Sequence, residues 1–301
     1  MITEHTESPE PYGAPVSRAG AGSKIELQTV TKIFGDGPMA KLVVEECSFT
    51  LEPGQVTVMV GPSGCGKSCI AFLIAGYERP TKGKIVLDGK AVGGPSWDRL
   101  VVFQESALLP WLTTYENIMF GPKARGFNKK EAQDRATGLL ERVGLRDFRD
   151  KYPPQLSGGM QRRAELARAL INDPKVMILD EPFRGLDHMT RGLMQEYCGT
   201  LFEEASRTTL FITTDIDEAI FLADRLLIMS SLPTRVHDVI EVDLPRPRVR
   251  QEVLLDPHAN QIKERALGIL HEEALKAFAG GSKASADFID AYMKRREGPE
   301  A

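Results

Sequence analysis

The sequence predicts an α/β fold in which strands and helices alternate around a phosphate-binding loop. Residues 61–68, Gly-Pro-Ser-Gly-Cys-Gly-Lys-Ser, have the spacing G-x-x-x-x-G-K-[ST] of such a loop. An apolar run at 56–60 precedes the loop and another at 68–75 follows it, as expected for a buried strand that leads into a helix. Short apolar runs that predict further strands follow at 100–103, 176–179 and 208–213.

Length and composition limit the classes of protein to consider. The chain has 301 residues, of which 42% are hydrophobic and 27% charged, which suits one large globular domain or one domain with an appendage. The net charge of −4 argues against nucleic-acid binding, since such domains usually carry a basic patch or stripe. No apolar run approaches the roughly 18 residues of a membrane span. Residues 1–15 also lack the basic and apolar regions of a secretory signal, so we expect a chain that is neither secreted nor membrane-spanning.

Four cysteines stand in the sequence, at Cys47, Cys65, Cys69 and Cys198. Their spacing fits no zinc pattern, and a phosphate loop is a poor place for a disulfide, so we expect reduced thiols of a cytosolic protein. Cys65 and Cys69 could react with oxidants, but small residues that fill tight space are the favoured interpretation.

The glycine-rich loop is expected to bind a nucleoside triphosphate. Its glycines let backbone N–H groups turn inward around a phosphate, and the following helix points its positive end at the same anion. Lys67 can reach the terminal phosphates, and the Ser68 hydroxyl is placed to ligate Mg²⁺. The loop positions expected to contact the nucleotide are Gly61, Pro62, Ser63, Gly64, Cys65, Gly66, Lys67 and Ser68.

Before the loop, residues 1–22 are rich in Pro, Gly, Ser and Glu and predict a disordered tail. Alternation at 25–30 and the run at 43–51 predict two strands. Phe34 lies between them; it could pack in the core or stack on a nucleotide base, and residue chemistry alone favours the core. A further strand is expected at 83–89, ending in an Asp-Gly turn.

After the strand at 100–103, Gln104 stands where ligands of open α/β sheets bind, at the carboxyl end of a strand. It could contact Mg²⁺ or the attacking water; taken alone, a surface glutamine is the simpler account. The apolar loop at 108–112 is either packed inside or exposed as a docking patch. A helix is expected at 128–143, with Asn128 and Glu131 in a capping box.

Two later segments carry further candidate chemistry. Ser157-Gly158-Gly159 opens a helix and repeats the features of a phosphate loop, so it is a second anion site or a helix N-cap with a tight turn. Asp180 and Glu181 follow an apolar strand. Asp180 can hold Mg²⁺, and Glu181 can orient and deprotonate the attacking water.

The remainder of the chain predicts closing elements and an appendage. A short helix is expected at 217–222 and strands at 225–229 and 236–244. Residues 245–248, Pro-Arg-Pro-Arg, are expected to form a linker that ends the domain. Two amphipathic helices follow, one around Ile262–Leu270 and one around Phe288–Met293, which pack on the domain or on a partner.

Taken in order, these segments resemble the ATP-binding subunit of an ABC transporter. The motifs that carry the resemblance are GPSGCGKS (61–68), the Gln104 loop, LSGGMQ (156–161), VMILDEP (176–182) and GLD (185–187). Three further passages resemble the importer branch for nitrate, sulfonate, taurine or bicarbonate, at 102–118, 215–225 and 241–248. The resemblance implies a P-loop NTPase of ABC type over 23–244, with a RecA-like core, an antiparallel β subdomain and a helical subdomain at about 105–172. Residues 245–301 would form the linker and a C-terminal helical extension.

The resemblance also implies a mechanism with ATP and Mg²⁺. Two cassettes, identical or different, would close head to tail, each ATP lying between one phosphate loop and the Ser157-Gly158-Gly159 turn of the other subunit. Phe34 would stack on adenine, Gln104 would sense Mg²⁺ and nucleotide, and Asp187 would connect the two sites. The groove near Leu108–Trp111 would receive a multi-span membrane permease that is served by a solute-binding protein. The cassette would thus sit peripherally at the cytoplasmic face of the membrane.

The family pattern breaks at two positions. Thr214 stands in place of the histidine that contacts the terminal phosphate, and Cys69 stands where a hydroxyl residue is usual beside the α-phosphate. Either Glu181 still supports hydrolysis, or the cassette is a weak or non-hydrolysing regulatory scaffold. Because Lys67, Asp180, Glu181 and Ser157 are present, we expect hydrolysis. A soluble ABC ATPase is a further alternative, against which the single cassette without a long heptad run argues.

Overall fold

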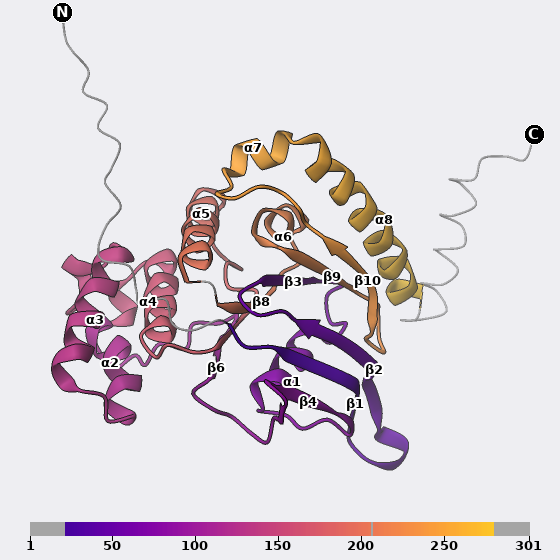
Figure 1. Cartoon of the computed structure of the whole chain (residues 1–301), viewed down its shortest axis with the longest axis horizontal. Helices are drawn as coiled ribbons and strands as arrows, with labels where there is room; N and C mark the ends of the chain where they lie inside the picture. The colour runs from indigo at the N-terminus through magenta and orange to yellow at the C-terminus, as the bar shows by residue number, and fades with distance from the viewer. Residues whose placement is uncertain (1–21, 206, 280–301) are drawn as a thin grey trace, which may run out of the picture. The chain divides into compact units, whose positions relative to one another are not determined.

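The computed structural model describes residues 22–205 and 207–279. The predicted tail, apart from its last residue, and the predicted helix around Phe288–Met293 lie outside these residues. The described residues divide into two compact units, one of residues 106–173 and one that combines residues 22–105 with 174–205 and 207–279. Each unit is described in turn (Figure 1).

The first sheet of the larger unit is antiparallel and four-stranded, in the order β2-β1-β4-β5. The apolar side chains of its two long strands that are buried join the core shared with the helix after the phosphate-type loop: Ile25, Leu27, Val30, Val44, Cys47 and Leu51. The strands are β1 (Ile25–Phe34), β2 (Lys41–Leu51), β4 (Lys82–Leu87) and β5 (Lys90–Ala91), with a 3₁₀ turn at Gly37–Met39 between β1 and β2.

The second sheet has six strands in the order β10-β9-β3-β8-β7-β6, of which only the β9–β10 pair is antiparallel. Its strands are β3 (Val56–Val60), β6 (Arg99–Val102), β7 (Val176–Asp180), β8 (Thr208–Ile212), β9 (Arg225–Met229) and β10 (Val236–Glu241). Strands β3, β7 and β8 are buried throughout, as central strands covered on both faces should be. Ile212 is in register with both Met59 and Asp180. The segments that follow β3, β7 and β8 therefore meet at one edge of the sheet.

Helices cover both faces of this sheet (Figure 1). Helix α1 (Lys67–Ala75) lies on one face, and Ile70, Leu73 and Ile74 join the core that it shares with the antiparallel sheet. On the other face lie α5 (His188–Ala205), α6 (Ile216–Leu222), α7 (Arg250–Leu255) and α8 (Pro257–Ala279). In the described parts of the chain, none of the helices has the length and apolar character needed to span a membrane.

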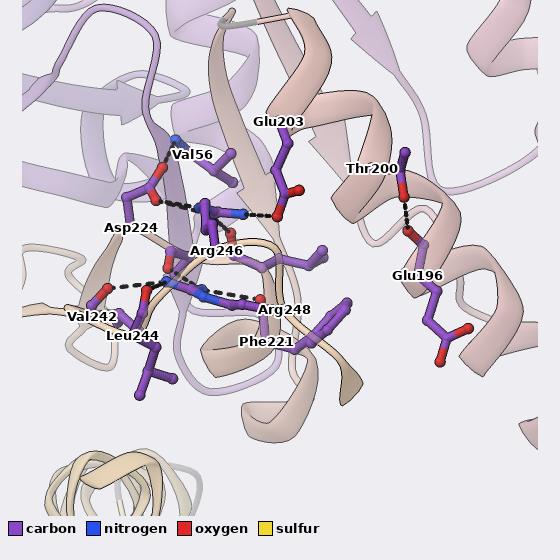
Figure 2. A network of polar contacts seen from close by, with 12 residues as sticks. Val56, Glu196, Thr200, Glu203, Phe221, Asp224, Val242, Leu244, Arg246 and Arg248 are labelled. Atoms are coloured by element: carbon purple, nitrogen blue, oxygen red, sulfur yellow. Dashed lines mark hydrogen bonds and ion pairs between the residues drawn. The ribbon is translucent and has the colours of Figure 1, made fainter. Parts of the chain in front are cut away.

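The predicted linker around Arg246 and Arg248 is packed against α6, as Figure 2 shows. The Arg248 guanidinium donates to five backbone carbonyls, those of Ile220, Phe221, Ala223, Val242 and Leu244. Arg246 bonds Asp224 at 2.8 Å and Glu203 at 3.2 Å. Burial and the neighbouring Arg246 lower the pKa of Arg248 to about 10. A cation at this end of α6 satisfies carbonyls that the helix itself leaves unpaired.

The smaller unit is helical, with α2 (Thr114–Ala124), α3 (Lys129–Arg142) and α4 (Gly158–Leu170) and two 3₁₀ turns at Arg146–Phe148 and Pro153–Gln155. Asn128 caps α3 by accepting from the N–H groups of Lys130 and Glu131. A reciprocal capping box that the sequence analysis missed opens α2, between Thr113 and Glu116. In the apolar loop before α2, Leu108 is buried whereas Trp111 is 69% exposed. Interior packing therefore holds for Leu108, and exposure holds for Trp111.

Candidate functional site

The phosphate-type loop joins β3 to α1 through backbone conformations that require glycine. Gly64 and Gly66 have φ values of +75° and +112°, and Gly66 is the N-cap residue of α1. A Cβ at Gly66 would lie 2.8 Å from Thr234 Oγ1, closer than packing allows. The loop residues 61–66 therefore turn tightly over the positive end of α1, which suits the binding of an anion.

Lys67, the first residue of α1, directs its ammonium group back into this loop. The side chain is only 5% exposed, and Nζ donates to the carbonyls of Gly61 at 2.9 Å and Pro62 at 3.0 Å. These partners are neutral, and an ammonium gains more from an anion than from a carbonyl. The lysine is thus held where a phosphate in the loop would meet it.

Ser68 and Asp180 come together from α1 and the end of β7, where their side chains are hydrogen-bonded. Burial raises the pKa of Asp180 from its ordinary value, and the adjacent Glu181 adds to this, while the Ser68 hydrogen bond and Lys67 act in the opposite direction. A hydroxyl and a carboxylate side by side supply the oxygen ligands that Mg²⁺ prefers.

Glu181 occupies a strained backbone conformation directly after this strand. Its φ of +43° is rare for a residue with a side chain, and such strain concentrates at functional sites. The Glu181 N–H donates to Ile212 O at 2.9 Å, which ties the turn to β8. Its Oε2 lies 3.2 Å from Nη1 of Arg184. Glu181 therefore lies at the edge of the sheet where β3 leads into the phosphate-type loop and where β8 ends.

The Thr213-Thr214-Asp215 segment follows β8 at the same edge. The Thr213 N–H donates to Met59 O at 3.2 Å, and its hydroxyl accepts from the Asp215 N–H at 3.0 Å. Asp215 in turn caps α6 by accepting from two of its N–H groups. Thr214 is exposed between these two anchored neighbours.

A pocket of about 240 Å³ opens over these residues. Its lining includes Ser63 of the loop, Glu181 and Thr214, three positions that the sequence analysis singled out. The remaining lining residues were missed: Phe183, Arg184, Arg191, Thr213, Asp215 and Glu218. Arg184 could have been found from its position three residues after Glu181. Glu218 gave no signal, because only the packing of α6 brings it to the pocket.

Other predicted residues lie around this edge. Gln104 stands two residues after the end of β6, which pairs with β7, the strand that ends at Asp180. Phe34 ends β1 and is 39% exposed, with Lys32 Nζ 4.6 Å from its ring centroid, so the interpretation of Phe34 as a core residue is wrong. Asp187 accepts from the Thr190 N–H at 3.0 Å just before α5, and hydrogen bonds from Thr190 lower its pKa.

The two cysteines of the loop region are free thiols with raised pKa values. Burial raises the pKa of Cys65, and it raises the pKa of Cys69 to about 11. Both groups therefore stay protonated near neutral pH, and low reactivity is the expected consequence.

In the helical unit, Ser157 is the N-cap residue of α4. Its Oγ accepts from the Met160 N–H at 3.3 Å, so the helix-cap interpretation is confirmed. Ser157 and Gly158 are exposed and Gly159 is buried. An exposed helix start of this kind keeps N–H groups available to an external anion.

Comparisons with known proteins extend this description. A family model described as "ABC transporter" matches residues 44–184. The bicarbonate transport ATP-binding protein CmpD of Synechocystis sp. is 40% identical over 250 residues, which cover 82% of this chain and 89% of that protein. The nitrate import ATP-binding protein NrtD of Synechococcus elongatus is 41% identical over 250 residues, covering 82% of this chain and 91% of that protein. The chain belongs to the ATP-binding proteins of ABC transporters.

Among solved structures, an ATP-binding cassette captured as a dimer in a post-hydrolysis state, MJ0796 bound to ADP and Pi, is similar to this cassette. The TM-score is 0.65 at 27% identity, and the match covers 73% of this chain and 100% of that one. The predicted family, the α/β P-loop fold of ABC type and the assignment as an ATP-binding ATPase are thereby confirmed.

One connection in this cassette links its C-terminal segment to the pocket. Glu218 is buried; burial raises its pKa, and hydrogen bonds from Thr213 and Gln195 act against that shift. Gln195 on α5 donates to Glu218 Oε1 at 2.9 Å and accepts from Arg250 Nε at 2.9 Å. A chain of side chains thus runs from Arg250 at the start of α7 to Thr213 at the pocket.

Proposed function

We propose that this cassette hydrolyses ATP to energise the import of a small anionic or polar solute. The observation that carries the proposal is the side-chain hydrogen bond between Ser68 and Asp180, because it joins the phosphate-type loop to the pair of carboxylates. The two relatives described above are named for bicarbonate transport and nitrate import, and both solutes are small oxyanions, which supports this class of solute.

In this proposal the loop residues 61–66 hold the phosphates of ATP through their N–H groups, with Lys67 at the terminal phosphates and Cys69 beside the α-phosphate. Ser68, Asp180 and Gln104 would hold Mg²⁺, which would neutralise charge on the phosphates. Their hydroxyl, carboxylate and amide oxygens fit that ion. Mg²⁺ uses few protein ligands beside substrate phosphates, so it needs no dedicated cage of acidic residues.

Glu181 is proposed as the residue that orients the attacking water and accepts its proton, and Thr214 as a hydrogen-bond donor to the terminal phosphate. The strained φ of Glu181 and its place in the pocket beside Thr214 and Ser63 support this assignment. Phe34, exposed at the end of β1, is proposed to stack on the adenine.

Assembly completes the site in this proposal. Ser157, Gly158 and Gly159 of one subunit bind the terminal phosphate of the ATP held by a second ATP-binding subunit, and Asp187 connects the two sites. A multi-span membrane permease docks near Leu108–Trp111, for which the exposure of Trp111 is the support. The cassette would thus be bound peripherally to the membrane at its cytoplasmic face, downstream of a solute-binding protein.

Steady-state ATPase measurement of the purified cassette with its permease, beside a Glu181→Gln variant, tests the proposal. Turnover that the variant loses while it still binds Mg-ATP is the expected result. Wild-type turnover no higher than that of Glu181→Gln would overturn it in favour of a nucleotide-dependent scaffold, which the threonine at position 214 in place of the family's histidine favours. Failure to copurify with any multi-span membrane protein would point to a soluble ABC ATPase.

A further inference from the structure

Arg184 lies beside the base proposed for hydrolysis, in the pocket that Thr214 also lines. Its Nη1 is 3.2 Å from Glu181 Oε2, and its side chain is 63% exposed. The Arg184 N–H donates to Glu181 O at 3.1 Å, which closes a turn and keeps the two side chains close together. The position of Arg184 is therefore fixed by the backbone as well as by the ion pair.

Hydrolysis of a terminal phosphate needs positive charge where negative charge accumulates. A threonine at position 214 offers a hydroxyl without charge, so position 214 itself contributes no positive charge to the pocket. A guanidinium is permanently charged, and its planar donors match phosphate oxygens. Arg184 has the chemistry that Thr214 lacks and lines the same pocket.

Arg191, the second arginine that lines the pocket, is held by other contacts. Arg191 Nη1 lies 3.8 Å from Asp215 Oδ2, and its Nη2 donates to Leu186 O at 3.3 Å. These contacts tie Arg191 to the start of α6 and to the loop before α5. Arg184 is the more exposed of the two, at 63% against 36% for Arg191, and solvent around its guanidinium weakens the ion pair with Glu181, whose own side chain is 17% exposed. A phosphate can therefore compete for Arg184 at low cost.

Building on the proposed function, we propose that Arg184 is a catalytic residue that contacts the terminal phosphate of ATP. It supplies there the positive charge that a histidine at position 214 would carry. In the nucleotide-free cassette Arg184 pairs with Glu181. On binding of ATP the guanidinium turns to the phosphate, and Glu181 is released to act on water.

The first test measures binding without turnover, by calorimetric titration of a non-hydrolysable ATP analogue and of ADP with Mg²⁺. Arg184→Ala should weaken binding of the analogue by about tenfold, the worth of a charged hydrogen bond, and leave ADP binding within about twofold. Arg184→Lys should keep part of the preference. The matched control is Arg146→Ala, which removes an exposed ion pair with Glu141 of similar length, 3.0 Å, in the helical unit, and it should change neither affinity.

The second test is rescue. Thr214→His introduced into the Arg184→Ala background should restore the preference for the triphosphate analogue together with turnover. Equal weakening of analogue and ADP by Arg184→Ala, or turnover that rises in that variant, would overturn the proposal. In the latter case Arg184 would restrain Glu181 instead. Because the analogue binding is measured without hydrolysis, its result stands apart from whether the wild-type cassette turns over ATP.

Discussion

The side-chain amide of Gln195 donates a hydrogen bond of 2.9 Å to the buried carboxylate of Glu218. Gln195 also accepts from Arg250, and Glu218 is bonded to the Thr213 hydroxyl that lines the pocket. The first residue of α7 thereby reaches the segment that carries Thr214 through only two intervening side chains. The C-terminal segment that follows β10 thus helps to position the candidate catalytic pocket.

Replacing Gln195 by leucine should destabilise the cassette and slow turnover. The change leaves the buried Glu218 without one of its donors and Arg250 without its acceptor, at a cost of about 1–3 kcal/mol. Thermal unfolding and ATPase activity at saturating ATP measure the two effects. Thr200→Ala, on the exposed face of the same helix, is the control and should stay within about 0.5 kcal/mol of wild type. Equal stability of the two variants would show that the chain of contacts contributes nothing.

Thr214→His should raise turnover by about fivefold, because an imidazole that can carry charge replaces the neutral hydroxyl donor and a hydrogen bond stronger by about 1 kcal/mol in the transition state has that effect. The exposed position of Thr214 leaves room for the larger side chain. ATPase rates at saturating Mg-ATP provide the measurement, with Thr214→Ser as the control that keeps the hydroxyl. Turnover unchanged by the histidine would mean that the pocket has adapted to threonine.

Arg248→Lys should destabilise the cassette although the charge is kept. An ammonium has three donors at one point, and it cannot reproduce the contacts of the guanidinium with the carbonyls at the end of α6 and after β10. We expect a loss of about 1–3 kcal/mol, seen as a lower thermal midpoint. Arg146→Lys, whose side chain is 72% exposed, is the matched control. A thermal midpoint as high as that of the control would show that the hydrogen bonds of the Arg248 guanidinium to these carbonyls do not stabilise the fold.

Gly66→Ala should abolish nucleotide binding and lower stability by about 1–3 kcal/mol. The added Cβ would meet Thr234 Oγ1 at 2.8 Å in a backbone conformation with φ of +112°. Gly138→Ala is the control, because it lies inside α3 with nothing near its Cβ, where alanine should be neutral or stabilising by up to about 1 kcal/mol. Binding of a fluorescent ATP analogue and thermal unfolding measure both variants. Normal binding by Gly66→Ala would show that the loop tolerates a side chain.

Glu273 should make the packing of α8 sensitive to acid. Burial acts to raise its pKa, but hydrogen bonds from Lys276 and from Ser231 outweigh it and lower the pKa from 4.5 to about 2. A lowered pKa means that the carboxylate stabilises the folded state fully above pH 4.5 and loses this contribution as the pH falls toward 2. Thermal midpoints of wild type and Glu273→Gln should therefore differ at neutral pH and converge in acid. A constant difference across that range would refute the assignment.

The sequence by itself determined the family, the phosphate-type loop and most of the strands of the sheet. These follow from local patterns: the glycine spacing at 61–68, the apolar runs of β3, β7 and β8, and the acids directly after β7. The break at Thr214 was also visible in the sequence. Local patterns specify which residue types stand at the ends of which strands, and the strands of a parallel sheet bring those ends to one edge.

Only the tertiary structure decided which other side chains share that edge. The ion pair of Arg191 with Asp215 and the path from Arg250 through Gln195 to Glu218 join residues whose sequence pattern gave no reason to connect them. Arg184 and Glu181 are three residues apart, but only the fold places both in the pocket with Thr214. The exposure of Phe34 and the hydrogen bonds from Arg248 to the carbonyls at the end of α6 likewise depend on packing. Periodicity reports on the burial of a face, whereas contacts between separate elements depend on how those elements pack, and for that reason they appear only in the folded chain.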